Sequence, residues 1–199
     1  MESNSVCTPG GKCVKLERMG LYTYEDNSLL RNIVHWIVDI VVVIALALFL
    51  VYGFLGQVMV SGHSMLPALN AEDMCLVNRL CYDVGSPKRF DIVVFERSDT
   101  KQQNIKRVIG LPGETIQIVA GAVYVNNYRL EDERIGTISL SGIAENPVEL
   151  QEGEYFLLGD NADLSEDSRF ANIGNVRREA IRGKVWFRLK PFQSFGPVR

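Results

Sequence analysis

The chain has 199 residues, which allows one substantial domain and an additional segment. Its net charge is −3 and its pI is about 5.5, and this balance excludes the strongly basic face of a typical nucleic-acid-binding protein. The sequence contains four cysteines without a CxxC pair and two histidines, so we expect no metal site and no other cofactor. The separation of Cys75 and Cys81 does not fix a disulfide geometry, and we expect free thiols.

An apolar segment at 33–55 is the first predicted element. It contains one acidic residue, Asp39, and no lysine or arginine. A helix needs about 20 mostly apolar residues to cross the hydrocarbon core of a membrane, and this segment meets that length. A buried helix of a soluble protein would carry a polar stripe, and a cleavable signal peptide would begin within the first few residues. We therefore predict a single transmembrane helix.

Basic residues flank this segment unequally. Four precede it: Lys12, Lys15, Arg18 and Arg31. After it, the next basic residue is Arg79. The positive-inside rule therefore predicts a single-pass protein of the cell membrane, in which residues 1–32 form a short, loosely ordered cytoplasmic tail and residues 56–199 lie outside the cytoplasm.

Residues 56–199 show the pattern of a mainly β domain. Short runs rich in β-branched and aromatic residues alternate with turn residues such as Pro112-Gly113 and Asn126-Asn127. Seven strands are predicted, at 74–78, 91–96, 105–109, 115–119, 122–125, 155–158 and 184–189. Because no apolar stripe of helix length is present, we predict one antiparallel β domain, as a folded sheet or a partly closed barrel.

The first motif that suggests chemistry is Val-Ser-Gly-His-Ser-Met-Leu-Pro at 60–67, a few residues after the apolar segment. Ser64 lies between flexible and turn-forming residues, a position typical of an exposed side chain. Its neighbour His63 is a poor candidate for its base, because adjacent residues rarely present their side chains to each other and a catalytic triad is defined by geometry.

The second motif is Ile-Lys-Arg-Val-Ile-Gly-Leu-Pro-Gly-Glu at 105–114. Side chains alternate between the faces of a strand, so Lys106 and Arg107 point to opposite faces and one of them should face the apolar side. Burial lowers the pKa of a lysine, and a lysine of this kind can act as a general base. Two exposed charges on an edge strand are the alternative interpretation.

The third motif is Gly-Asp-Asn-Ala-Asp-Leu-Ser-Glu-Asp-Ser-Arg at 159–169, directly after a predicted apolar strand. Ser165, Asp167 and Arg169 alternate, so in an extended segment they share one face. This favours a structural ion pair beside a hydroxyl that can hold a neighbouring group. A calcium loop is the alternative, but it would need more regularly spaced oxygen ligands and a closing glutamate.

The three motifs, in this order and after an apolar anchor, resemble those of the type I signal peptidases. The SM-x-P box of that family resembles residues 64–67, its KR-x-x-G-L-P-G box resembles 106–113, and its GDN…S-x-DSR box resembles 159–169. The resemblance covers about residues 30–190. The lysine and the short chain are similar to the compact Gram-positive members of the bacterial branch.

The resemblance implies a membrane-bound serine endopeptidase that removes signal peptides from exported preproteins, cutting after small residues at positions −3 and −1. Ser64 would be the nucleophile and Lys106 the general base. Ser165 would hydrogen-bond to the lysine amine, and the Ser64 N–H would donate to the oxyanion. The implied supporting residues are the ion pair of Asp167 with Arg169, together with Asp160, Arg107 and Gly62.

Gly62 stands where some family members have a serine that supplies a second oxyanion donor, so that donor is left open. Ala68 stands where the pattern usually has threonine. The implied substrate-binding residues are apolar, and core packing is the alternative for each: Val58, Val60, Met65, Leu69 and Ile105. The expected partners are exported preproteins and membrane lipid, and the protein is expected to be a monomer that binds no nucleic acid.

Three other functions are weighed against this one. A catalytically inactive, signal-peptidase-like assembly factor for surface proteins would have lost the serine or the lysine, and both are present. A self-cleaving repressor with a Ser-Lys site would be cytosolic and linked to DNA, which the apolar segment and the acidic pI oppose. A membrane-anchored β domain that only binds partners would leave the three motifs as a coincidence.

Overall fold

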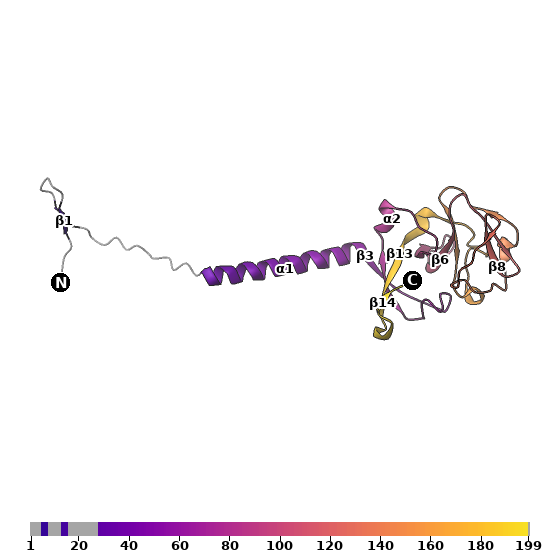
Figure 1. Cartoon of the computed structure of the whole chain (residues 1–199), viewed down its shortest axis with the longest axis horizontal. Helices are drawn as coiled ribbons and strands as arrows, with labels where there is room; N and C mark the ends of the chain where they lie inside the picture. Colours follow the sequence, from indigo (N-terminus) through magenta and orange to yellow (C-terminus); the bar gives the residue numbers. More distant parts are fainter. Residues whose placement is uncertain (1–4, 8–12, 16–27, 199) are drawn as a thin grey trace. The chain divides into compact units, whose positions relative to one another are not determined.

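The computed structural model describes residues 5–7, 13–15 and 28–198. The chain divides into two units, Met1–Leu46 and Ala47–Arg199. Figure 1 shows their elements in chain order. The domain boundaries predicted from the sequence, at 32/33 and 55/56, remain a proposal.

A short hairpin lies in the first unit. β1 (Ser5–Cys7) pairs antiparallel with β2 (Cys13–Lys15), and Val6 and Val14 are direct partners. The sequence predicts a loosely ordered tail here. For these six residues the structure differs from that expectation, because β-branched residues favour paired strands. The other residues of the expected tail before Ser28 lie outside the described part of the chain.

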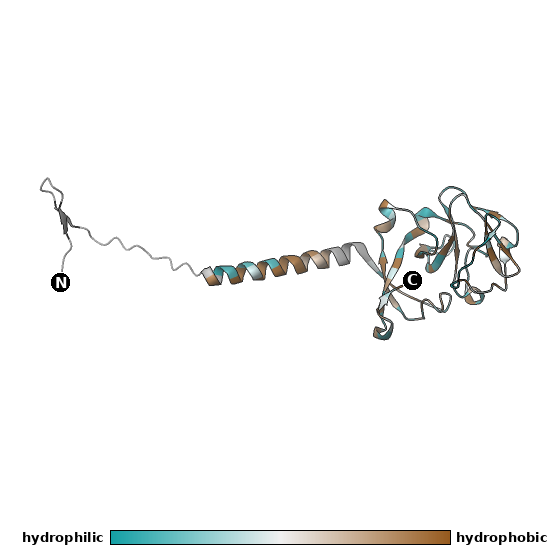
Figure 2. Ribbon diagram, viewed as in Figure 1, coloured by the Kyte–Doolittle hydropathy of each residue, from teal (hydrophilic) through white to brown (hydrophobic). Residues whose placement is uncertain are grey.

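The long helix α1 (Ser28–Phe54) begins five residues before the predicted span and ends one residue before its predicted end. Its apolar character over the described side chains is visible in Figure 2. Among the described residues it is the one helix that is long and apolar enough to cross a membrane, over Arg31–Phe49. An N-terminal apolar helix is therefore present, as the sequence predicts.

The second unit consists of short strands and a few helical turns. The strands are β3 (Leu55–Met59), β4 (Met74–Asn78), β5 (Ile92–Glu96), β6 (Gln103–Gly110), β7 (Thr115–Val119), β8 (Ala122–Val125), β9 (Tyr128–Arg129), β10 (Val148–Glu149), β11 (Glu154–Leu158), β12 (Val176–Arg177), β13 (Ile181–Lys190) and β14 (Gly196–Pro197). The helical elements are α2 (Cys81–Val84), η1 (Gly142–Glu145), η2 (Ala162–Leu164), η3 (Arg178–Ala180) and η4 (Phe192–Ser194). All seven predicted strands are present, with ends within three residues of the prediction.

The strands form a large and a small sheet. The large sheet has the order β12-β11-β6-β5-β13-β4-β3, with β14 paired to β13, and the small sheet has the order β10-β7-β8-β9. All neighbouring strands in these two sheets are antiparallel. The prediction of a mainly antiparallel β domain is confirmed.

Two strand edges of the large sheet are open, and they position the candidate site. β3 ends the strand order and pairs only with β4. β6 pairs with β11 through residues 107–110, so its first half, residues 103–106, pairs only with β5. β3 is not among the strands predicted from the sequence, because its five residues include Gly56 and Gln57 and directly follow the apolar helical run.

Three buried apolar clusters hold the second unit together. One lies around the small sheet, one lies around β11 and β12, and one lies beneath the open strand edges. The last cluster includes Val60, Met65, Leu69 and Ile105. Cys75 is buried in the same cluster and Cys81 is half-buried, and both are free thiols as predicted.

Candidate active site

Ser64 lies in the turn that follows β3, next to the open edge of β6. The Nζ atom of Lys106 donates a hydrogen bond to Ser64 Oγ over 2.9 Å. The two residues are 42 positions apart, so the contact depends on the pairing of β6 within the large sheet. The predicted nucleophile and the predicted base therefore come together directly.

Lys106 is almost fully buried, with 4% of its surface exposed. Burial lowers the pKa of Lys106 from its usual 10.5 to about 8, because an ammonium group loses hydration in an apolar site. The nearby Asp167 carboxylate acts in the opposite direction and raises this pKa, whereas the nearby Arg97 guanidinium lowers it further. The amine can therefore lose its proton close to neutral pH.

The neighbouring residue Arg107 is also buried, contrary to the alternative of two exposed charges. Its Nε and Nη2 atoms each donate to the Asp160 carboxylate over 2.7 Å. The Arg107 side chain is 1% exposed and that of Asp160 is 3% exposed. Bidentate pairing of this kind fixes both partners geometrically. It ties β6, immediately after the lysine, to the start of the third motif.

The third motif forms a buried network. Arg169 Nε donates to Asp167 over 2.8 Å, and neither side chain is more than 1% exposed. The Ser165 hydroxyl also donates to Asp167, over 2.7 Å. The family resemblance implies a hydrogen bond between Ser165 and Lys106. In the structure the Ser165 hydroxyl instead turns to Asp167, because a carboxylate is the stronger acceptor.

This network is joined to the nucleophile through the backbone. The Asn161 N–H donates to the Ser64 carbonyl over 3.0 Å, and the Gly159 N–H donates to the Asp167 carboxylate over 3.1 Å. A Cβ on Gly159 would lie 2.2 Å from Ser165 Oγ and 2.6 Å from the Ser64 carbonyl oxygen. Glycine is therefore needed here for the close approach of the two motifs.

One backbone donor at Ser64 is available for a developing oxyanion. In the described part of the chain, the Ser64 N–H donates to no protein acceptor. Gly62 has a φ of +84°, a backbone conformation that favours glycine, and the space around its α-carbon is open. His63 is exposed, and its side chain makes no hydrogen bond within the described residues. The Ser64 hydroxyl is therefore hydrogen-bonded to Lys106 and not to His63.

A cleft of about 140 Å³ lies along the two open strand edges. Among the predicted substrate-binding residues, Val58, Val60, Met65 and Ile105 line it beside Ser64 and Lys106. Leu69 does not line the cleft, because it is completely buried in the cluster beneath it. Apolar character alone does not distinguish a cleft wall from the core behind it.

Two charged residues near the cleft were not singled out from the sequence. Glu166 lines the cleft, and its carboxylate accepts a hydrogen bond from Arg97 over 2.5 Å and one from Asn172 over 2.7 Å. Arg97 also pairs with Asp99. Glu166 lies within the third motif, but its partner is 69 residues away, and no pattern in the sequence joins them.

A serine hydroxyl, a lysine of lowered pKa and a free N–H in one cleft are the parts of a serine hydrolase that attacks an acyl group. Comparison with known proteins agrees. The family model for "Signal peptidase, peptidase S26" matches residues 33–190, and the chain belongs to this family. It is a serine endopeptidase of the signal peptidase type.

Individual relatives of the chain are signal peptidases I. Signal peptidase I of Bacillus caldolyticus is 37% identical over 172 residues, which cover 80% of this chain and 91% of the relative. Signal peptidase I T of Bacillus subtilis (strain 168) is 33% identical over 169 residues, which cover 80% of this chain and 86% of the relative. A crystal structure of a signal peptidase I from Enterococcus faecalis V583 is 29% identical, covers 51% of this chain and 98% of its own, and has a TM-score of 0.42.

Proposed function

We propose that Ser64 and Lys106 form a catalytic dyad that removes signal peptides from exported preproteins. The observation that carries the proposal is the 2.9 Å hydrogen bond from Lys106 Nζ to Ser64 Oγ inside a cleft that lowers the pKa of the lysine to about 8. A neutral amine at this distance can accept the serine proton, which activates a hydroxyl that is otherwise a weak nucleophile.

The reaction proceeds in two steps, the formation of an acyl-enzyme and its hydrolysis. The neutral Lys106 amine takes the Ser64 proton while Oγ bonds to the carbonyl carbon of the scissile peptide. The oxyanion accepts a hydrogen bond from the Ser64 N–H. The ammonium group then gives its proton to the leaving nitrogen as the peptide bond breaks. In the second step a water gives a proton to Lys106 and attacks the acyl-enzyme, and the ammonium group returns the proton to Ser64.

The cleft supports a preference for small side chains. Its volume of about 140 Å³ leaves little room beside Ser64, and its walls at Val58, Val60 and Ile105 are apolar. An extended substrate can pair with the open edges of β3 and β6, because both edges have free backbone groups. Small residues at positions −3 and −1 then point to the same apolar floor, since side chains two residues apart share one face of a strand.

The proposed placement is a single-pass protein of the cell membrane. α1 would be the anchor, with the N-terminus in the cytoplasm and the second unit outside. Ser64 lies ten residues after the end of α1, so an anchored enzyme keeps its nucleophile close to the bilayer, where signal peptides are delivered. Such a tether raises the effective concentration of the substrate without a new contact.

The test is cleavage of a purified preprotein in lipid vesicles by the wild type and three variants. We expect Ser64→Ala and Lys106→Arg to be inactive, because an arginine side chain stays protonated. His63→Ala is the control and should remain active. Activity in Lys106→Arg together with inactivity in His63→Ala would replace the dyad by a histidine mechanism. A folded wild type that binds preproteins without cleaving them would favour the inactive assembly factor.

A further inference from the structure

A second and larger chamber continues the active-site cleft. It has a volume of about 410 Å³, compared with about 140 Å³ for the cleft. The two spaces share Val58 from β3 and Gln103 from β6 as walls, so they form one groove between the same two strand edges. The chamber lies at the end of the groove where β3 and β6 begin, away from Ser64 and Lys106.

The chamber has an apolar floor and a charged rim. Residues of β4, β5 and β6 that face the cluster beneath the cleft lie at every second position, and each of these rows ends in a polar residue at the chamber. Val77 is followed on its face by Arg79, Val94 by Glu96, and Ile105 is preceded by Gln103. The rim therefore lies on the same face of the sheet as the cleft walls. It is reached by moving two residues further along each strand.

Arg79 lies at this rim beside Gly56 of β3, which has no side chain in its way. An ideal Cβ on Gly56 would lie 2.9 Å from Arg79 Nε and 3.0 Å from Arg79 Nη2, so the guanidinium group lies against the bare backbone of Gly56. Within the described residues, the Arg79 side chain donates no hydrogen bond to a protein group. The second arginine at the rim, Arg182, is paired with Glu96 over 2.6 Å. The rim thus has two positive charges and one negative charge. Arg182 is paired with Glu96, which leaves the guanidinium group of Arg79 free.

We propose that this chamber is a specificity subsite that receives the side chain at position −5 of the signal peptide and prefers a glutamate there. The proposal rests on the proposed function, because it extends the substrate strand of that site. The occupant is a long acidic side chain. It reaches Arg79 through the wide chamber, whereas positions −3 and −1 face the narrow cleft.

The register follows from strand geometry. A substrate strand beside β3 advances by about 3.3 Å per residue, and every second side chain points to the same face. With position −1 next to Val60 and position −3 next to Val58, position −5 falls next to Gly56, where Arg79 lies. The direction follows from the anchor, because α1 ends at Phe54 and β3 begins at the next residue. The apolar part of a signal peptide precedes its scissile bond, so its upstream residues meet the start of β3.

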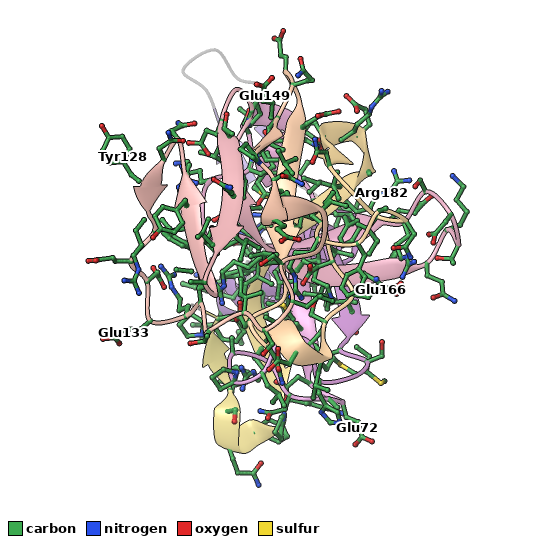
Figure 3. The ribbon with its side chains drawn as sticks, turned by 90° about the vertical axis from the view of Figure 1, so that its right-hand side faces the viewer. Glu72, Tyr128, Glu133, Glu149, Glu166 and Arg182 are labelled. Carbon is green, nitrogen blue, oxygen red and sulfur yellow. The ribbon has the colours of Figure 1, made fainter. Side chains whose placement is uncertain are left out.

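Figure 3 labels Arg182, from the chamber rim, and Glu166, from the cleft, on the same side of the domain, whereas Tyr128 and Glu133 of the small-sheet region lie on the other side. This arrangement gives a matched control. Arg129, on β9 of the small sheet, is an exposed arginine like Arg79 and lines neither the chamber nor the cleft.

The experiment measures kcat/KM of the full-length enzyme in neutral detergent with peptides that differ only at position −5. The reference peptide has alanine there, and the test peptides have glutamate, glutamine or lysine. We expect glutamate to exceed glutamine by about fivefold, the upper value for an exposed ion pair, and lysine to be cleaved more slowly than glutamine. Arg79→Gln should remove the preference, Arg79→Glu should reverse it, and Arg129→Gln should leave it unchanged.

The remaining outcomes separate the possible failures. Cleavage of the alanine peptide by the wild type but not by Ser64→Ala upholds the proposed function whatever happens at position −5. Equal rates for glutamate and lysine at position −5 would overturn the subsite. A loss in Arg79→Gln that is the same for every peptide would show that Arg79 does not recognise the side chain at position −5, and it would also overturn the subsite.

Discussion

Asp167 and Arg169 form an ion pair in which neither side chain is more than 1% exposed. Asp167 also accepts hydrogen bonds from the Ser165 hydroxyl and the Gly159 N–H. Removing one partner of a buried pair leaves an uncompensated charge in a dry site. The pair therefore holds the third motif in place as a unit, and its loss should affect stability as well as activity.

Arg169→Ala should lower the free energy of unfolding by about 3–5 kcal/mol, the range for a broken buried pair. Denaturant unfolding measures this directly. Arg134→Ala is the matched control, because Arg134 is 41% exposed and pairs with Asp132 two residues away. Its cost should stay below about 1 kcal/mol. Equal costs in the two variants would show that burial of the Asp167 pair does not contribute.

The pH dependence of cleavage should report the ionisation of Lys106. The lysine acts as a base only when neutral, so kcat/KM should rise with pH and reach half of its maximum near the lysine pKa of about 8. Glu166 raises this pKa and Arg97 lowers it. Glu166→Gln should therefore move the acid limb to lower pH, and Arg97→Gln should move it to higher pH. Shifts in the same direction would exclude an electrostatic effect of this pair on the lysine.

The lysine should also destabilise the fold that it serves. Its pKa is about 8 in the folded chain and 10.5 ordinarily, so between these values the unfolded chain binds more protons and stability rises with pH. At pH 7 the lysine is protonated in both the folded and the unfolded chain, so the full cost of burying its charge lowers the free energy of unfolding. Lys106→Met should therefore increase the free energy of unfolding at pH 7 by about 1–3 kcal/mol, and the gain should shrink towards pH 10.5. A gain that stays constant over this pH range would assign the effect to packing alone.

Gly159→Ala should damage the site through a steric clash. The added methyl group would meet Ser165 Oγ at 2.2 Å and the Ser64 carbonyl oxygen at 2.6 Å, and part of this contact is with backbone. We expect a loss of at least about tenfold in kcat with a smaller change in melting temperature, because displacement of Ser64 affects the chemistry before it affects the core. Gly136→Ala is the control, because Gly136 has open space around it and no positive φ, and its kcat should be unchanged.

Much of the fold could be predicted from local sequence patterns. Short runs rich in β-branched and aromatic residues, separated by turn residues, predicted all seven strands, because each strand contributes apolar side chains to one of the clusters. β3 was missed for the opposite reason. Its five residues include Gly56 and Gln57, and its first residue, Leu55, continues the apolar run of α1, which cannot be divided into helix and strand by periodicity alone.

The candidate site was predictable only in part. Its main residues lie in three motifs whose order resembles a known family, but the partner of each side chain depends on long-range pairing. The sequence does not show that the Ser165 hydroxyl turns to Asp167, or that Arg97 reaches Glu166. It also does not distinguish Leu69 in the core from Val58 in the cleft wall, since depth of burial is set by the packing of the sheets.

The start of β3 defines the shortest chain expected to remain active. Leu55 and Gly56 pair with Asn78 and Val77 of β4, so a chain that begins at Leu55 keeps the whole edge strand, whereas one that begins at Gln57 loses two of its paired residues. We expect the chain from Leu55 to fold in detergent and to cleave short peptides at a rate close to that of the full chain. The chain from Gln57 should melt at a lower temperature.

On preproteins held in vesicles, the chain from Leu55 should be slower than the full-length enzyme by about 10²-fold, because it lacks α1 and the effective concentration that a tether provides. The measurement is a comparison of the two chains on the same preprotein in vesicles and on the same peptide in detergent. A deficit confined to the vesicle assay is the expected result. Equal rates in vesicles would contradict the anchoring role of α1, and equal deficits in both assays would instead indicate that the shortened domain is impaired in itself.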